Sequence, residues 1–224
     1  MRLRVEYRVG PELRFLGNLD MMRLMQRSLR RASIPFALSQ GFNPHIKLSM
    51  GTVLPVGLWG EKEYFDIELA EDIGIKDFVE RMNDVFPPPV LINECNEILN
   101  DEPALMKIIN AASYKFFVRK SSLDLDLWKD EFTAKDSLVI RSRGKKKDRD
   151  KDLRPGIFKV TVQKFHNFDI MEIWSSTGMP LNVRYDELLE TMVLTGLDKK
   201  NIIDVFRSGN YIKEGLKYFT PMKR

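Results

Sequence analysis

The stretch RLRVEYRV, residues 2–9, alternates between charged and apolar side chains with a period of two. Such alternation is typical of a β-strand with one face in the core and the other in solvent. The core face carries Leu3, Val5, Tyr7 and Val9, and the solvent face carries Arg2, Arg4, Glu6 and Arg8. The stretch therefore predicts a half-buried strand, and the segments after it decide which sheet it joins.

Those segments predict a unit of the order βαββαβ. Asn18 is expected to cap a helix that runs to Ala32 and ends before Pro35. Its buried stripe would comprise Met22, Met25, Leu29 and Ala32. The later elements are a second strand that starts at FAL (36–38), a strand at 61–70, an amphipathic helix at 75–86 and a strand at 90–99. This order is that of the ferredoxin-like fold, with helices on one face of an antiparallel sheet.

The same order recurs after a short linking helix in residues 100–111. Strands are predicted at 113–120, 137–143, 157–165, 168–176 and 201–208, and helices at 123–134 and 185–194. We therefore predict an α+β protein of two ferredoxin-like units in tandem. The expected boundaries are 1–100 for the first domain, 101–111 for the linker and 112–224 for the second domain, which has an additional hairpin strand.

Composition excludes several kinds of site. The only cysteine, Cys95, falls in a predicted strand and is expected in the core, so no internal disulfide or multi-thiolate metal site can form. We predict no metal and no cofactor. No run approaches the roughly 18 to 20 apolar residues of a membrane span, so we expect a cytoplasmic protein without membrane contact.

Catalytic motifs are equally sparse. Neither a glycine-rich phosphate loop nor a nucleotide-binding fingerprint is present. Of the two histidines, His166 is expected in a turn, and His45 is a weak candidate for a general base because no nucleophile motif lies beside it.

Charge is distributed unevenly along the chain. Residues 1–50 have nine basic and three acidic side chains, a net charge of +6, whereas residues 61–102 have three basic and thirteen acidic ones, a net charge of −10. This asymmetry favours an oriented partner, or else describes two solvated faces of an ordinary protein.

Basic side chains gather in two segments. Arg23, Arg27, Arg30 and Arg31 fall on one stripe of the first helix, and residues 141–154 form a highly charged hairpin arm. The candidate anion-binding or nucleic-acid-binding residues are Arg14, Arg23, Arg27, Arg30, Arg31, Lys47, Arg141, Arg143, Lys145, Lys146, Lys147 and Arg149. Guanidinium groups suit phosphates, but a solubilising face with salt bridges would have the same pattern.

The stretch SQGFNPHIKLSMG, residues 39–51, is unusually rich in turn-forming and polar residues. Gly41 and Pro44 predict a tight turn. The candidate recognition residues are Ser39, Gln40, Asn43 and His45. Ser39 and Asn43 can bond the backbone of the turn, which would leave Gln40, His45 and Lys47 pointing outward. The loop either presents these groups to a ligand or satisfies backbone groups between two strands.

Aromatic and basic residues interleave in two strands of the second half. Tyr114, Phe116 and Phe117 lie in one of them, and Phe158 and Phe165 in the other. Aromatic side chains on a sheet surface stack on unpaired bases in ferredoxin-like RNA-binding domains, although some of these rings must face the core.

Residues 13–69 resemble the bacterial family of radical SAM-linked proteins. The matching pieces are RFL, LD, RSLRRA, SQGFNPH, KLS, LPVG and EYFDIEL, followed later by DLRP (152–155) and RYDELLE (184–190). Gly17 and Asn18 depart from the FLSHLD pattern of the family, so a histidine role at that helix start is in doubt here. The resemblance implies a partner, a radical SAM protein with a cobalamin-binding-like region. The single thiol agrees with this, since it cannot hold the three-cysteine cluster of such an enzyme.

The expected function is therefore that of an accessory binding module for a radical SAM enzyme, recognising RNA or a ribosome-related substrate. Two alternatives remain: a protein–protein adaptor without nucleic-acid binding, and an RNA-processing nuclease with His45 as general base.

Overall fold

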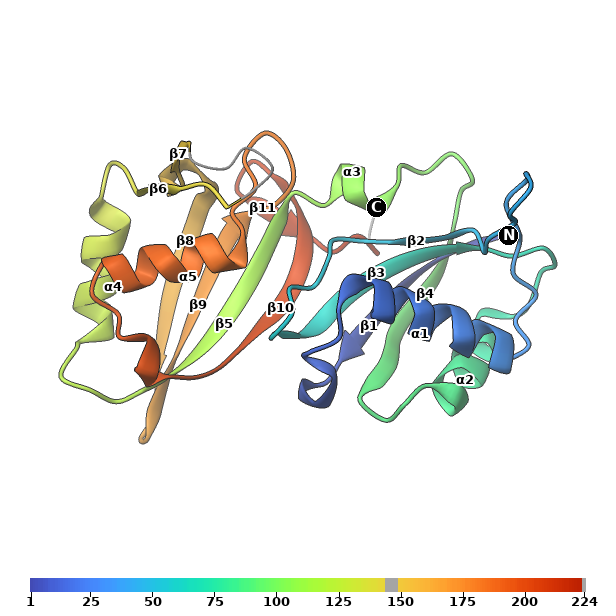
Figure 1. Ribbon diagram of the computed structural model, residues 1–224, viewed down its shortest axis with the longest axis horizontal. Helices are drawn as coiled ribbons and strands as arrows, with labels where there is room; N and C mark the ends of the chain where they lie inside the picture. Colours follow the sequence, from blue (N-terminus) through green and yellow to red (C-terminus); the bar gives the residue numbers. More distant parts are fainter. Residues whose placement is uncertain (144–148, 223–224) are drawn as a thin grey trace. The chain divides into compact units, whose positions relative to one another are not determined.

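The structure is a computed structural model that describes residues 1–143 and 149–222 (Figure 1). It is an α+β protein with helices and sheet strands, many of which pair antiparallel with their neighbours. Two compact units make up the chain: unit 1 is Met1–Ile109 with Gly209–Arg224, and unit 2 is Asn110–Ser208. Residues 209–224, which the sequence placed in the second domain, thus belong with the first unit.

Unit 1 has the strand order β4-β1-β3-β2. Its elements are β1 (Arg2–Val9), a 3-10 turn (Pro11–Leu13), α1 (Asn18–Arg31), β2 (Leu48–Met50), β3 (Trp59–Glu68), α2 (Ile75–Val85), β4 (Val90–Ile98) and α3 (Leu105–Ile108), with the end of β10 (Ile202–Glu214) and β11 (Lys217–Phe219). The FAL segment makes only isolated bridges, Phe36 with Leu69 and Leu38 with Ile46. The second strand instead lies inside the segment predicted as a loop, because residues 48–50 are the ones that pair with β3.

Helices α1 and α2 lie on one face of this sheet and contact each other (Figure 1). Met25 of α1 and Phe78 of α2 are fully buried against the apolar residues of β1, as the alternation predicts. Helix α1 is capped by Gly17 rather than Asn18, and Met21 rather than Met22 is buried. Two neighbouring stripes of the helix have the required spacing, so the sequence alone did not distinguish them.

The second face of the unit 1 sheet differs from the prediction, because it is buried too. Arg4 and Glu6 of β1 are 2% and 6% exposed. The apolar residues over this face come from α3 and from the end of the chain: Leu105, Ile108, Ile109, Ile212 and Met222, in contact with Tyr64. Charged residues tolerate such burial when they are paired, and the pairs are described below.

Unit 2 has the strand order β10-β5-β9-β8. Its elements are β5 (Ala111–Arg119), α4 (Leu125–Ala134), β6 (Val139–Arg141), β7 (Asp150–Asp152), a 3-10 turn (Arg154–Gly156), β8 (Ile157–Lys164), β9 (Phe168–Ser176), α5 (Tyr185–Leu194), a 3-10 turn (Lys199–Asn201) and the start of β10. The predicted strand at 137–143 is shorter than expected and leaves the main sheet, because β6 pairs with β7 in a hairpin of its own.

Figure 1 shows α5 across the strands of unit 2, and its first residue, Tyr185, packs on Tyr114 and Phe116 of β5. Helix α5 therefore covers the face of Tyr114 and Phe116 and leaves the opposite face of these strands uncovered by this helix. In the part of the chain described here, no helix is both long and apolar enough to cross a membrane.

Candidate nucleic-acid interface

Helix α1 exposes all four of its arginines, Arg23, Arg27, Arg30 and Arg31. The helix is held firmly beneath them, because its other side is in the core. Arg81 of α2 also caps its C-terminus, donating to the carbonyl oxygens of Ala32, at 2.6 Å and 3.0 Å, and of Ser33. The arginines thus project from a fixed surface.

Few acidic groups neutralise this surface. Arg23 pairs with Asp20 one turn earlier, at 3.3 Å and in solvent, which is a weak interaction. Arg30 donates to the carbonyl oxygen of Gln26 and lies 5.7 Å from the ring centroid of Phe36. Within residues 1–143 and 149–222, no carboxylate pairs with Arg27, Arg30 or Arg31. Three guanidinium groups within about one turn of helix are therefore available for anions.

Two predicted members of the basic surface are engaged elsewhere. Arg14 is half-buried, and its Nε donates to the carbonyl oxygen of Pro11 at 2.9 Å. Lys47 pairs with Glu68 at 2.6 Å. It lies on the sheet face away from α1, because the adjacent Ile46 and Ile67 are in the core beneath α1. The structure does not bring Lys47 to the arginines of α1.

The predicted recognition loop is closed by its first and last residues. The Oγ of Ser39 accepts the backbone N–H of His45 at 3.1 Å and lies 2.8 Å from His45 Nδ1, while the Ser39 N–H donates to the His45 carbonyl. Gly41 has a φ of +126°, which favours glycine. Gln40, Phe42 and Asn43 are exposed at the tip, as expected for Gln40.

This geometry changes the interpretation of His45. The histidine remains exposed, but its Nδ1 holds the loop instead of reaching outward. A Ser–His contact resembles the start of a nucleophile–base pair, which needs a third group to orient the base. The described residues place no carboxylate on His45, so the contact is a loop closure, and the nuclease alternative has no support from it.

The basic arm is a hairpin attached to the start of α5. Glu187 is fully buried there: its Oε1 accepts the Arg143 N–H at 2.9 Å, and its Oε2 accepts Lys151 Nζ at 2.5 Å. The Arg143 side chain pairs with Glu190 at 2.8 Å. Sequence reasoning missed Glu187, although the acid-rich first turn of the predicted helix was a signal for it.

Of the other arm residues, Arg141 pairs with Asp150 in solvent at 3.3 Å, and Arg149 is exposed. Lys145, Lys146 and Lys147 lie outside the described residues. Among the described arm residues, Lys151 has the most buried partner, Glu187.

The charge asymmetry of the sequence is not a separation in space. Asp66 of the acidic segment accepts hydrogen bonds from both Arg2 and Arg4 of the basic segment. Glu68 likewise pairs with Lys47 of the basic segment. Because β1 and β3 are neighbours, part of the charge of the two segments is neutralised within unit 1. The expected oriented charge is therefore reduced to local surfaces such as α1.

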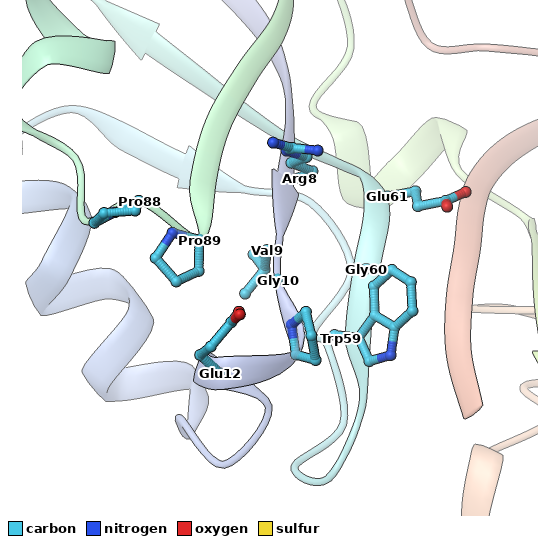
Figure 2. A pocket seen from close by; sticks show the side chains of 10 residues that line it. Arg8, Val9, Gly10, Glu12, Trp59, Gly60, Glu61, Pro88 and Pro89 are labelled. Atoms are coloured by element: carbon cyan, nitrogen blue, oxygen red, sulfur yellow. The ribbon is translucent and has the colours of Figure 1, made fainter. Parts of the chain in front are cut away.

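A hollow of about 660 Å³ lies at one end of the unit 1 strands. Figure 2 shows Glu12 and Pro89 on one side of it, Trp59 on the other and Arg8 at the far end. Glycine suits position 10 because it has no Cβ, and a Cβ there would lie 3.1 Å from Pro89. No sequence pattern singles out this hollow, since its residues come from three separate segments.

The two later motifs of the resemblance have structural roles. Asp152 accepts the N–H groups of Leu138 and Arg154, which lower its pKa. The Arg154 side chain donates to the carbonyl oxygens of Thr133 and Lys135 and so ends α4. Arg184 pairs with Asp186 at 3.0 Å at the start of α5.

The aromatic residues of the two predicted strands divide between the two faces of the unit 2 sheet. Tyr114 and Phe116 are buried under α5, so they cannot stack on bases. Phe117 and Phe158 are half-buried, and Phe165 is 46% exposed. His166 lies in the turn after Phe165, as predicted.

Comparison with known proteins gives one family and a distant structural likeness. Residues 2–185 match the model of a family described as "Uncharacterized protein conserved in bacteria (DUF2344)". No curated protein matches the sequence significantly. Among solved structures, the fold is similar to a chain in the "Crystal Structure of a Cbf5-Nop10-Gar1 Complex", with a TM-score of 0.47 and 9% sequence identity. The match covers 93% of this chain and 47% of that one.

Proposed function

The chain belongs to the family described as "Uncharacterized protein conserved in bacteria (DUF2344)", and we propose that it is an accessory module that binds RNA through helix α1. The family description names no activity, so the proposal rests on the surfaces of the protein. The RNA would be a cellular RNA or a ribosome-related substrate. The binding residues would be Arg23, Arg27, Arg30 and Arg31.

One observation carries this proposal: Arg27, Arg30 and Arg31 are exposed on a rigid helix with no acidic partner among the described residues. Together with Arg23 they occupy successive turns of α1, each of which rises by about 5.4 Å, so the four guanidinium groups form a line along the helix. Arginine donates in a planar fork that matches phosphate oxygens. A line of such forks suits a phosphate backbone better than a single small anion.

Arg30 and Arg31 also have a structural use. They lie in the last turn of α1, where cations stabilise the negative end of the helix dipole. Arg23 and Arg27 lie further from that end, so this role does not account for them.

The proposal includes a partner and a compartment. The resemblance to radical SAM-linked proteins supports a radical SAM enzyme as the partner, and both proteins would then work in the cytoplasm. The single buried cysteine is consistent with this division, since any iron–sulfur cluster would be held by the partner.

We also infer that each unit is ferredoxin-like. The order β4-β1-β3-β2 of unit 1 and the order β10-β5-β9-β8 of unit 2 become the same when the main-sheet strands of each unit are counted from its first strand. The β6–β7 hairpin would be an insertion after the first helix of the second copy.

A second candidate, the protein–protein adaptor, is favoured by Phe42. This ring is fully exposed at the tip of a loop that the Ser39–His45 contacts close. An exposed aromatic side chain on a constrained loop is well suited to insert into a pocket of a protein partner. Phe42→Ala would then weaken co-purification with the radical SAM protein and leave RNA binding unchanged.

The experiment that separates the two is an electrophoretic mobility shift with total cellular RNA. The wild type is compared with a variant in which the four α1 arginines are alanine. A shift that the variant loses supports the RNA module. The absence of any shift with the wild type removes that proposal and leaves the adaptor.

A further inference from the structure

One face of the unit 2 sheet carries side chains that α5 does not cover. Along β5, Tyr114 and Phe116 point toward α5, so Lys115 and Phe117 point to the opposite face. Phe117 pairs in register with Ile170, and Arg119 with Phe168, which places these residues of β9 on the same face. This face therefore carries Phe117 and Phe168.

Four phenylalanine rings follow one another across this face. The centroid of Phe117 lies 6.0 Å from that of Phe206 in β10 and 5.5 Å from that of Phe168 in β9. Phe165, at the end of β8, stacks on Phe168 at 5.3 Å with an interplanar angle of 19°. We call this set the phenylalanine row.

The row becomes more accessible toward the β8–β9 turn. Phe206 is 3% exposed, Phe117 and Phe168 are half-buried, and Phe165 is 46% exposed. Aromatic side chains normally gain stability by burial. Burial therefore accounts for Phe206 but not for the exposed ring of Phe165.

Polar groups with hydrogen-bond donors surround the open end. Arg119 is exposed and directly opposite Phe168 in the sheet register. His166 and Asn167, in the turn between Phe165 and Phe168, are both exposed. At the other end, Lys115 Nζ lies 5.8 Å from the ring centroid of Phe206.

The acidic groups nearest this end are directed elsewhere. Asp169 follows Phe168, so its side chain points to the opposite face, where it pairs with Lys120 at 2.5 Å and Lys164 at 3.7 Å. Glu172 is on the same face as the row but further along β9, and it accepts from Ser208 at 3.1 Å. The open end of the row therefore combines aromatic faces with positive charge.

We propose that the phenylalanine row binds the bases of single-stranded RNA, with Phe165 and Phe168 as the stacking residues and Arg119 on the adjacent phosphate. Unpaired bases stack on aromatic side chains of a sheet surface, whereas bases in a duplex are not accessible to such a surface. The inference rests on the proposed function only in that the ligand is RNA, since the row and α1 share no residue.

The phosphate chemistry and the stacking chemistry have different signatures. Loss of a phosphate contact lowers the slope of log Kd against log salt, whereas loss of a stacking contact weakens binding at every salt concentration and leaves that slope unchanged. The two surfaces can therefore be tested in one experiment.

The experiment measures the Kd of a fluorescein-labelled oligouridylate, and of a duplex of the same length, by fluorescence anisotropy over a salt series. The variants are Phe165→Ala, Phe165→Tyr and, as control, Leu194→Ala. Leu194 is 70% exposed at the end of α5, on the helix side of the same unit. Phe165 is exposed enough that its removal leaves the fold intact.

We expect Phe165→Ala to raise the Kd for the single strand about ten-fold with an unchanged salt slope, since one stacked base contributes roughly that factor. Phe165→Tyr keeps the ring and should bind like the wild type, as should Leu194→Ala. Binding of the duplex should be the same for all three variants.

An unchanged Kd in Phe165→Ala, or a wild type that does not bind the oligouridylate, overturns the inference. Loss of protein co-purification in Phe165→Ala without loss of RNA affinity also overturns it, because the row would then be a protein-docking surface. If the α1 variant binds normally and Phe165→Ala does not, the row stands and α1 fails as the binding surface. Photo-crosslinking of 4-thiouridine RNA to residues 165–168 gives an independent readout.

Discussion

Arg4 and Asp66 form a bidentate ion pair inside unit 1. Arg4 Nε lies 2.8 Å from Asp66 Oδ1, Arg4 Nη2 lies 3.0 Å from Oδ2, and both side chains are almost fully buried. Arg2 adds a third contact to the same carboxylate at 2.7 Å. The pair joins the basic first strand to the acidic third strand. Two segments that differ in net charge along the sequence are thus linked by an ion pair between neighbouring strands.

Asp66→Ala should destabilise the protein by about 3–5 kcal/mol, because it leaves the Arg4 guanidinium buried without its counter-ion. The free energy of unfolding from urea titration gives the value. Glu68→Gln is the matched control, because Glu68 lies on the same strand as Asp66. This change breaks the solvent-exposed pair of Glu68 with Lys47 and should cost less than about 1 kcal/mol. Equal effects of the two changes would contradict the account.

Glu187→Gln should loosen the arm. The Glu187 carboxylate accepts both the Arg143 N–H and the Lys151 ammonium, so its loss leaves Lys151 without a buried partner. The expected result is a cost of about 3 kcal/mol and faster hydrogen exchange of the Arg143 amide. In Glu190→Gln, which removes only the half-buried partner of the Arg143 side chain, that amide should remain protected.

Stability should fall as the pH rises above about 9. Burial raises the pKa of the Cys95 thiol to about 12, and burial, followed by Tyr114 and Asp204, raises the pKa of Tyr185 to about 12. The folded state keeps these protons while the unfolded state loses them from pH 9 to 10 upward, so the pH rise favours unfolding. Urea titrations at pH 8 and pH 10.5 measure the loss.

Cys95→Ala removes one of the two titrations and should reduce that difference between pH values. The thiol of the wild type should also react slowly with a thiol reagent at pH 8 and rapidly in urea. Rapid reaction in the folded protein would show that Cys95 is accessible and its pKa unperturbed.

Gly156→Ala should destabilise the protein by about 1–3 kcal/mol. A Cβ at this position would lie 2.5 Å from Ser176 Oγ and 2.6 Å from Val183 Cγ2, within a buried turn. Combining it with Val183→Ala, which removes the second contact, should cost less than the sum of the two single changes. If the stability costs of the two changes simply add, the strain in Gly156→Ala does not arise from its contact with Val183.

Much of the secondary structure could be predicted from the sequence, because it rests on local periodicity. The alternation of residues 2–9 fixed one face of β1, and the spacing of apolar residues located α1, α2, α4 and α5. The second face of β1 could not be predicted, since the residues that cover it, such as Leu105 and Met222, are about 100 and 220 positions further along the chain. Pairing of Arg4 with Asp66 also depends on strand order.

The candidate site could likewise be predicted only where it depends on local periodicity. Exposure of the α1 arginines follows from the helix periodicity and is confirmed. Whether Lys47 joins them depends on which sheet face it occupies, and the alternation from Ile46 directs it away. His45 was predicted as an outward-pointing group, and only the loop geometry shows its Nδ1 turned to Ser39.

The central claim, that the arginine face of α1 binds RNA, is tested most directly by the salt dependence of RNA affinity. The test variant replaces Arg23, Arg27, Arg30 and Arg31 by alanine. The control variant replaces four exposed cations away from α1, Lys135, Lys199, Lys200 and Lys217, so that both variants lose the same net charge. The account predicts that the α1 variant lowers the slope of log Kd against log salt by up to about 3, while the control keeps the wild-type slope. Equal slopes in the two variants would contradict it.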